Sequence, residues 1–172
     1  IARLNRFAPP TLVGRSTNSL TWGWETDPPP PSDLNILDSE DLENSTNIPS
    51  PEAGQYEVGS LGPNSPHRVR VRAIYPGFRL DSDDSLPAHT LALPPKSVSL
   101  SRAGDNALTI SWQLNGNPVG TIYRIDAIPA AGLPITGRTS GSSWTTGSLD
   151  SNQPYAVTVR SINGDGIETS IS

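Results

Sequence analysis

The chain has 172 residues, of which 34% are hydrophobic, carries a formal net charge of −5 and contains no cysteine. Without cysteine it can have no disulfide, thiolate metal site or cysteine nucleophile, and its acidic charge argues against a general nucleic-acid-binding protein. No apolar run approaches the roughly 18 residues of a membrane span, and frequent glycine and proline (15 and 18 residues) favour an all-β chain rather than long helices.

The sequence begins with a segment that resembles a strand from later in the chain. Residues 1–8 align without gaps with residues 86–93, and each segment is followed by a proline pair, Pro9-Pro10 or Pro94-Pro95. We therefore expect residues 1–8 to be the terminal strand of a preceding repeat, or an exchange strand that pairs with a neighbouring molecule.

A duplication then organises the rest of the chain. Residues 18–24 (NSLTWGW) return as residues 106–112 (NALTISW), and the Gly-Ser-Leu of residues 59–61 returns at residues 147–149, so both pairs are separated by 88 residues. A fixed spacing between matching blocks indicates a duplicated folding unit. The sequence predicts two domains, residues 9–94 and residues 95–172.

Strands are predicted where apolar and polar residues alternate with a period of two between turn-forming residues. In the first unit these segments are residues 20–24, 34–37, 55–58 and 69–73; in the second they are residues 108–112, 121–125, 143–146 and 155–160. Trp24 and Trp112 end the equivalent second strands, where the alternation turns both inward, so we expect both in the core.

Three features carry a family resemblance: the Pro-Pro pair before each first strand, the strands that end in Trp24 and Trp112, and Leu149 six residues before Tyr155. This pattern resembles the fibronectin type III domain. The resemblance implies two tandem immunoglobulin-like, seven-stranded β-sandwiches joined by a short proline-rich linker, with Leu149 in the core. It also implies a corner in which the Tyr155 hydroxyl bonds to nearby backbone; the first unit has His67 at that place.

Arg68, Arg70 and Arg72 alternate along one strand and are expected to share its outer face. One interpretation is a solvated ladder that is neutralised by the acidic residues of segment 38–43. The other is a stripe that binds an anion or an acidic partner.

Tyr75 and Phe78 lie in a segment, residues 75–80, that we expect to be a long loop. Exposed aromatic residues on loops often bind partners. The alternative is that these two residues pack against a preceding domain.

Asp81, Asp83 and Asp84 form an acidic cluster in the following segment. Clustered carboxylates suit calcium, but this segment lacks the glycine and the distal glutamate of an EF-hand loop, so an acidic turn is the alternative. Asn44 begins an Asn-Ser-Thr sequon, which matters only if the chain enters a glycosylating pathway. We expect no metal and no cofactor.

Catalytic patterns are missing from the sequence, because its two histidines are isolated and its paired carboxylates occur only in loops. The sequence therefore predicts no enzyme, but a structural spacer or assembly module of a larger extracellular or cell-surface protein, similar to bacterial examples. Its expected partners are neighbouring domains or subunits, with no nucleic acid and no membrane span. Two alternatives stay open: an adhesion module that binds a protein or a glycan through loops of the first domain, and a filament subunit that assembles by strand addition through residues 1–8.

Overall fold

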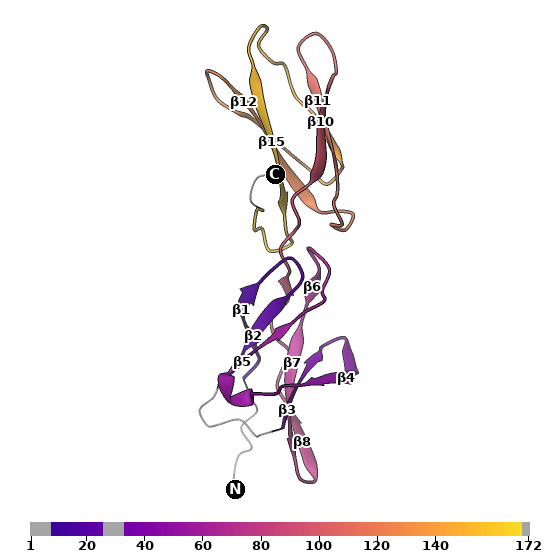
Figure 1. The fold of residues 1–172 in the computed structure, drawn as a ribbon, viewed down its shortest axis with the longest axis vertical. Coiled ribbons are helices and arrows are strands. Elements are labelled where there is room, and N and C mark those ends of the chain that lie inside the picture. The colour runs from indigo at the N-terminus through magenta and orange to yellow at the C-terminus, as the bar shows by residue number, and fades with distance from the viewer. Residues whose placement is uncertain (1–7, 26–32, 170–172) are drawn as a thin grey trace. The chain divides into compact units, whose positions relative to one another are not determined.

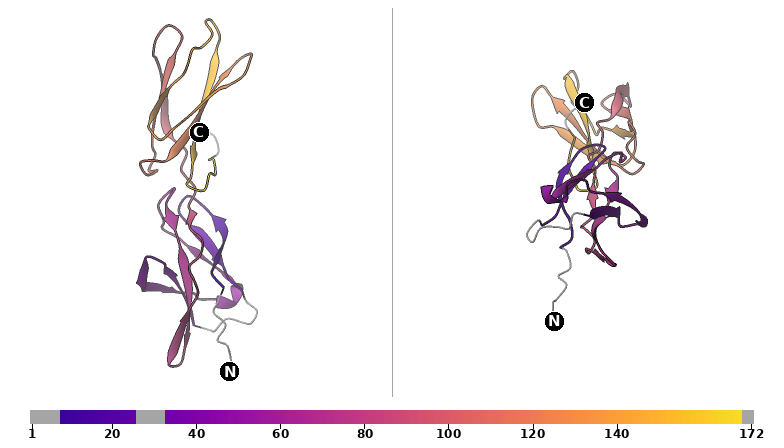
Figure 2. Two further views of the ribbon diagram at one scale, coloured as in Figure 1. Left: turned by 180° about the vertical axis from the view of Figure 1, so that it is seen from behind. Right: turned by 60° about the horizontal axis from the view of Figure 1, so that its bottom comes forward.

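A computed structural model describes residues 8–25 and 33–169 (Figures 1 and 2). The described chain is antiparallel β-structure with one short 3-10 helix, η1 (Pro51–Ala53), so the predicted all-β class is confirmed. Its contacts divide it into two compact units: unit 1 comprises residues 1–61 and 66–90, and unit 2 comprises residues 62–65 and 91–172. The expected strand at residues 1–8 lies outside the described residues, apart from its last residue.

Unit 1 is a sandwich of two antiparallel sheets with a short strand pair beside them. The first sheet has the order β1 (Thr11–Arg15), β2 (Leu20–Gly23), β5 (Gln55–Val58); the second has the order β4 (Asp41–Asn47), β3 (Leu34–Asp38), β7 (Val69–Tyr75), β8 (Phe78–Asp81); the short pair is β6 (Pro66–His67) with β9 (Ala88–His89). Figure 1 shows β5 and β4 on separate sheets of this unit, each at a sheet edge.

Unit 2 repeats this design with two three-stranded sheets. The first has the order β10 (Lys96–Arg102), β11 (Leu108–Gln113), β14 (Ser143–Thr145); the second has the order β13 (Ile135–Thr139), β12 (Ile122–Pro129), β15 (Tyr155–Ile162). The described end of the chain lies along β15 through a single bridge between Ile162 and Glu168 and a hydrogen bond from Thr169 N to Ser161 O of 2.9 Å.

The core of unit 1 forms from the inward residues of β2, β3 and β7, and its central aromatic residue is Trp22 rather than Trp24. Trp22 is 1% exposed, whereas Trp24 is only partly buried and its indole Nε1 donates to Pro51 O at 3.1 Å. The alternation along the strand places Trp22 and Trp24 on the same face. However, Trp24 follows the last residue of β2, so it reaches only the margin of the core.

In the core of unit 2, Trp112 is 5% exposed and packs against Tyr123, with ring centroids 5.3 Å apart and ring planes tilted by 53°. Buried Ile110, Ile125 and Val159 complete the cluster. The indole Nε1 of Trp112 is buried and makes no hydrogen bond with a described residue.

Two segments are more regular than expected. Residues 75–80 do not form a long loop, because β7 and β8 pair up to Tyr75 and Phe78 and leave only Pro76 and Gly77 as the connection. Gly77 has φ of 87°, and Pro followed by Gly at the two central positions is the preference of a type II turn. Acidic and polar residues 41–47, for which no strand is predicted, form β4 through pairing with β3.

Candidate functional site

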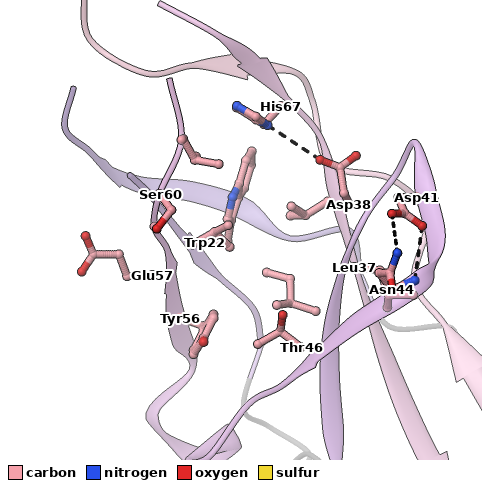
Figure 3. A pocket seen from close by; sticks show the side chains of 15 residues that line it. Trp22, Leu37, Asp38, Asp41, Asn44, Thr46, Tyr56, Glu57, Ser60 and His67 are labelled. Atoms are coloured by element: carbon pink, nitrogen blue, oxygen red, sulfur yellow. Dashed lines mark hydrogen bonds and ion pairs between the residues drawn. The ribbon is translucent and has the colours of Figure 1, made fainter. Parts of the chain in front are cut away.

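A cavity of about 380 Å³ opens between the two sheets of unit 1, beside the outer edges of β4 and β5 (Figure 3). Its size lies within the range of roughly 300–1,000 Å³ that is usual for ligand pockets. Apolar core residues form its inner wall and polar residues surround its mouth. The lining includes Trp22, Ile36, Val69, Asp38, Asp41, Asn44, Thr46, Tyr56, Glu57, Ser60 and His67.

The cavity exists because β4 is not covered by the opposite sheet. All seven residues of β4 are exposed, although its backbone pairs with β3. A sandwich strand normally buries one of its two faces against the facing sheet. On β4 the residues that line the cavity are Asp41, Asn44 and Thr46, so this inner face is left open.

Polar side chains line the mouth of this cavity. At the mouth, Asp38 Oδ2 lies 3.7 Å from His67 Nδ1, and Asn44 Nδ2 donates to Asp41 Oδ2 at 2.8 Å. The side-chain hydrogen bond from Asn44 lowers the pKa of Asp41.

Two of the three arginines in the stripe, Arg70 and Arg72, are paired with carboxylates, but with different ones from those expected. Arg72 donates to both carboxylate oxygens of Asp81, from Nε at 2.6 Å and from Nη2 at 2.7 Å. Arg70 contacts Asp84 through Nη2 at 2.6 Å and Nε at 2.8 Å. These carboxylates come from β8 and the segment after it, not from segment 38–43, because β8 is the strand that pairs with β7. Arg68 is exposed and precedes β7.

These ion pairs change the interpretation of the acidic cluster. The hydrogen bond from Arg72 is the largest influence that lowers the pKa of Asp81. Burial opposes ionisation of Asp84, but hydrogen bonds from Ser39 and Arg70 outweigh it and lower the pKa of Asp84. Asp81 and Asp84 therefore face guanidinium groups, with exposed Asp83 between them. Over residues 8–25 and 33–169, no three metal-ligating side chains gather, and the calcium interpretation of this cluster stays an untested prediction.

Tyr75 and Phe78 form the tip of the β7–β8 hairpin. Their rings stack with centroids 4.7 Å apart and planes within 12° of parallel, and Phe78 is 49% exposed. The hairpin register explains the pair, because Tyr75 and Phe78 are cross-strand partners.

Sequence reasoning did not single out a buried carboxylate in unit 2. Asp126 of β12 is 4% exposed, although it shares the outer face of its sheet with Arg124. Asp126 accepts from Thr136 Oγ1 at 2.7 Å, from Arg160 Nη1 at 3.1 Å and from Arg124 Nε at 3.2 Å. The outward alternation of arginine and aspartate on β12 is the signal that could have found it.

The predicted tyrosine corner is present in unit 2. Asp150 N donates to the Tyr155 hydroxyl at 3.0 Å, and the partly buried Leu149 donates from its backbone N to Asn106 O at 2.7 Å. In unit 1 the matching backbone bond runs from Leu61 N to the Asn18 carbonyl at 2.9 Å. The duplicated Gly-Ser-Leu segments therefore make the same contact in both units.

Comparisons with known proteins agree with this fold. The profile of the family described as "Fibronectin type III domain" matches residues 93–172. Residues 93–172 are a fibronectin type III domain. Unit 1 resembles it in sheet order, and the family predicted from the sequence is confirmed.

Two solved structures extend the comparison to the whole chain. A segment of two fibronectin type III domains from chicken tenascin matches with a TM-score of 0.60 and 18% identity, over 98% of this chain and 97% of that chain. The FN1–FN3 domains of chicken CNTN1 match with a TM-score of 0.44 and 20% identity, over 96% of this chain and 65% of that chain. No curated protein matches the sequence. The tenascin segment shows that the chain has the fold of tandem fibronectin type III domains.

Fibronectin type III domains are commonly non-catalytic structural or adhesion modules and are found mostly in extracellular or surface proteins. In the part of the chain that the structure describes, no helix has the length and apolar character that crossing a membrane requires.

Proposed function

We propose that this chain is a non-catalytic spacer or assembly module of a larger extracellular or cell-surface protein. The observation that carries the proposal is that each unit has a separate hydrophobic core, centred on Trp22 in unit 1 and on Trp112 in unit 2. Tandem domains with separate cores can extend a protein without depending on a bound ligand for their stability.

The paired charges support the same proposal. The least exposed ion-paired arginine of each unit is held by a carboxylate of its own unit: Arg72 by Asp81, and Arg160 by Asp126. A side chain that is already paired has less to offer an outside anion, because binding would have to replace an existing ion pair. The outer sheet faces therefore serve the folded state rather than recognition of an acidic partner.

Location and spacing are tested separately. Antibodies against the chain should label intact cells of the source organism, and external protease should remove the label while an internal marker survives. In single-molecule stretching, the chain should unfold in two events, each of which releases about 3.3–3.6 Å of extended length per residue unfolded. Labelling that requires permeabilised cells would contradict the extracellular location, and a single unfolding event would contradict two independent spacer units.

The adhesion alternative is favoured by one observation, the stack of exposed Phe78 on partly buried Tyr75 at a hairpin tip. Beads coated with the chain should then adhere to extracellular protein or glycan surfaces, and Tyr75→Ser with Phe78→Ser should abolish the adhesion. A matched control is Arg79→Ser, which changes an exposed residue of the same hairpin. Adhesion that survives the double substitution would assign it to another surface.

The filament alternative depends on residues 1–8, of which residues 1–7 lie outside the described part of the chain. It keeps its own test: deletion of residues 1–8 should abolish multimers in light scattering if strand addition forms them. Multimers that persist after the deletion would rule out strand addition by this segment.

A further inference from the structure

The two units differ at the same sandwich edge, where the last strands of the two sheets face each other. In unit 2 this edge is closed by Trp144 of β14, which packs on Gly137 of β13. A Cβ added to Gly137 would overlap the Trp144 indole, so the contact depends on the absence of a side chain there. An aromatic ring thus joins the two sheets of unit 2 at this edge.

The strand registers identify the matching positions in unit 1. Tyr56 corresponds to Trp144, because each pairs with the third residue of the second strand of its unit. Thr46 corresponds to Gly137, because each pairs with the buried isoleucine of the neighbouring strand, β3 or β12. Thr46 is exposed, and the cavity of about 380 Å³ lies between it and Tyr56. Unit 1 is therefore open where its duplicate is closed by an indole (Figure 3).

Two features of the cavity indicate what it accepts. Its inner wall is apolar and aromatic, which suits a flat hydrophobic ring. Asp38, Asp41 and Glu57 supply carboxylates to its lining, whereas no lysine or arginine of the described residues lines it, so a cation is favoured at the mouth.

The sheet edges also indicate the shape of the occupant. β4 and β5 are each the terminal strand of their sheet, so each presents an edge that no described strand pairs with. Unpaired strand edges are templates for an added extended segment. A polypeptide that lies along this opening supplies both backbone carbonyl acceptors and side chains that point into the cavity.

We propose that the cavity of unit 1 binds an extended segment of a partner polypeptide that inserts an aromatic side chain beside a basic residue. The aromatic ring occupies the place that Trp144 fills in unit 2. The basic residue lies against Asp38 and Asp41. This recognition goes beyond the spacer role, because a spacer keeps its length whether or not the cavity is filled.

The experiment uses the whole chain, labelled with ¹⁵N, and follows the indole N–H signals of its tryptophans by NMR. Trp22→Phe assigns the Trp22 signal. The probes are the capped peptides Lys-Trp-Lys and Glu-Trp-Glu. We expect Lys-Trp-Lys to shift the Trp22 indole signal and the amide signals of residues 44–46 and 56–60 with saturation, and to bind at least tenfold more tightly than Glu-Trp-Glu.

Two variants separate insertion from nonspecific attraction. Tyr56→Trp combined with Thr46→Gly copies the closure of unit 2 and should abolish binding of Lys-Trp-Lys. Asp38→Asn combined with Asp41→Asn should weaken that binding at least tenfold and reduce its dependence on salt, whereas Glu43→Gln, an exposed position of β4 that does not line the cavity, should leave it unchanged. Each variant is first shown to melt cooperatively. If the variant that copies the closure of unit 2 does not, Ser60→Trp replaces it, because this substitution places a blocking ring at the mouth of the cavity.

The proposal is overturned if millimolar Lys-Trp-Lys leaves the Trp22 indole signal in place. It is also overturned if Glu-Trp-Glu binds equally well, or if the shifts fall mainly in unit 2. Saturable shifts of the same signals by a neutral oligosaccharide, without shifts by the peptide, would identify a different occupant and reject this one. The spacer proposal is independent of every one of these results, because its tests are cell labelling and stretching.

Discussion

Replacing Trp22 by alanine should destabilise unit 1 far more than replacing Trp24. Trp22 is 1% exposed and central to the core cluster, and truncation of such a tryptophan costs about 3–5 kcal/mol through lost transfer energy and the cavity left behind. Trp24 is partly buried and donates one hydrogen bond to a backbone carbonyl. Its truncation should cost about 1–2 kcal/mol.

The difference is large enough to measure by heat. For a domain of 60–100 residues, each 1 kcal/mol moves Tm by about 4–8 °C, so Trp22→Ala should lower the Tm of unit 1 by about 12 °C or more. Differential scanning calorimetry of the whole chain measures this shift. Trp112→Ala, which removes a side chain that is 5% exposed in unit 2, is the matched variant and should lower the other transition instead.

Circular dichroism in denaturant gives the same comparison as a free energy of unfolding. Two results would refute the reasoning. If Trp24→Ala cost as much as Trp22→Ala, the margin of the core would matter as much as its centre. If Trp22→Ala lowered both transitions equally, the two cores would not be independent.

Three further predictions concern single contacts. Gly137→Ala should lower the free energy of unfolding of unit 2 by about 1–3 kcal/mol, because the added Cβ overlaps Trp144. The control Gly147→Ala should be nearly neutral, because a Cβ there meets nothing within 4 Å. Equal costs of the two substitutions in urea unfolding would argue against the closed edge. The arginine hydrogen bond keeps the pKa of Asp81 lower in the folded than in the unfolded protein, so its stabilisation is present above the unfolded pKa of about 3.9 and is lost as pH falls through the folded pKa. Asp81→Asn should therefore flatten the decline of unit 1 stability below about pH 4, and an unchanged pH profile would contradict this assignment. Tyr155→Phe removes the hydroxyl that accepts a backbone hydrogen bond at 3.0 Å and should lower the stability of unit 2 by about 0.5–1.5 kcal/mol in the same measurement; no loss would show that the corner bond is replaced by water.

The local pattern of the sequence was enough to predict the architecture. The 88-residue spacing and the period-two alternation predicted two all-β sandwiches, because both depend only on residues close together in the chain or on their exact repetition. The bond from Asp150 N to the Tyr155 hydroxyl joins residues five apart, and a corner at Tyr155 was expected from the resemblance to the fibronectin type III domain.

Tertiary pairing decided the remaining features. Whether Trp22 or Trp24 is central depends on where β2 ends, and the partners of the arginines depend on which strand pairs with β7; neither is written in the alternation of a single strand. The cavity depends on the packing of strands that are still farther apart in the chain. β4 pairs with β3 yet leaves its inner face uncovered, and the closing contact between Trp144 and Gly137 joins two different sheets. A binary pattern states which face of a strand is apolar, but the distance between two facing sheets is set by side chains from both of them.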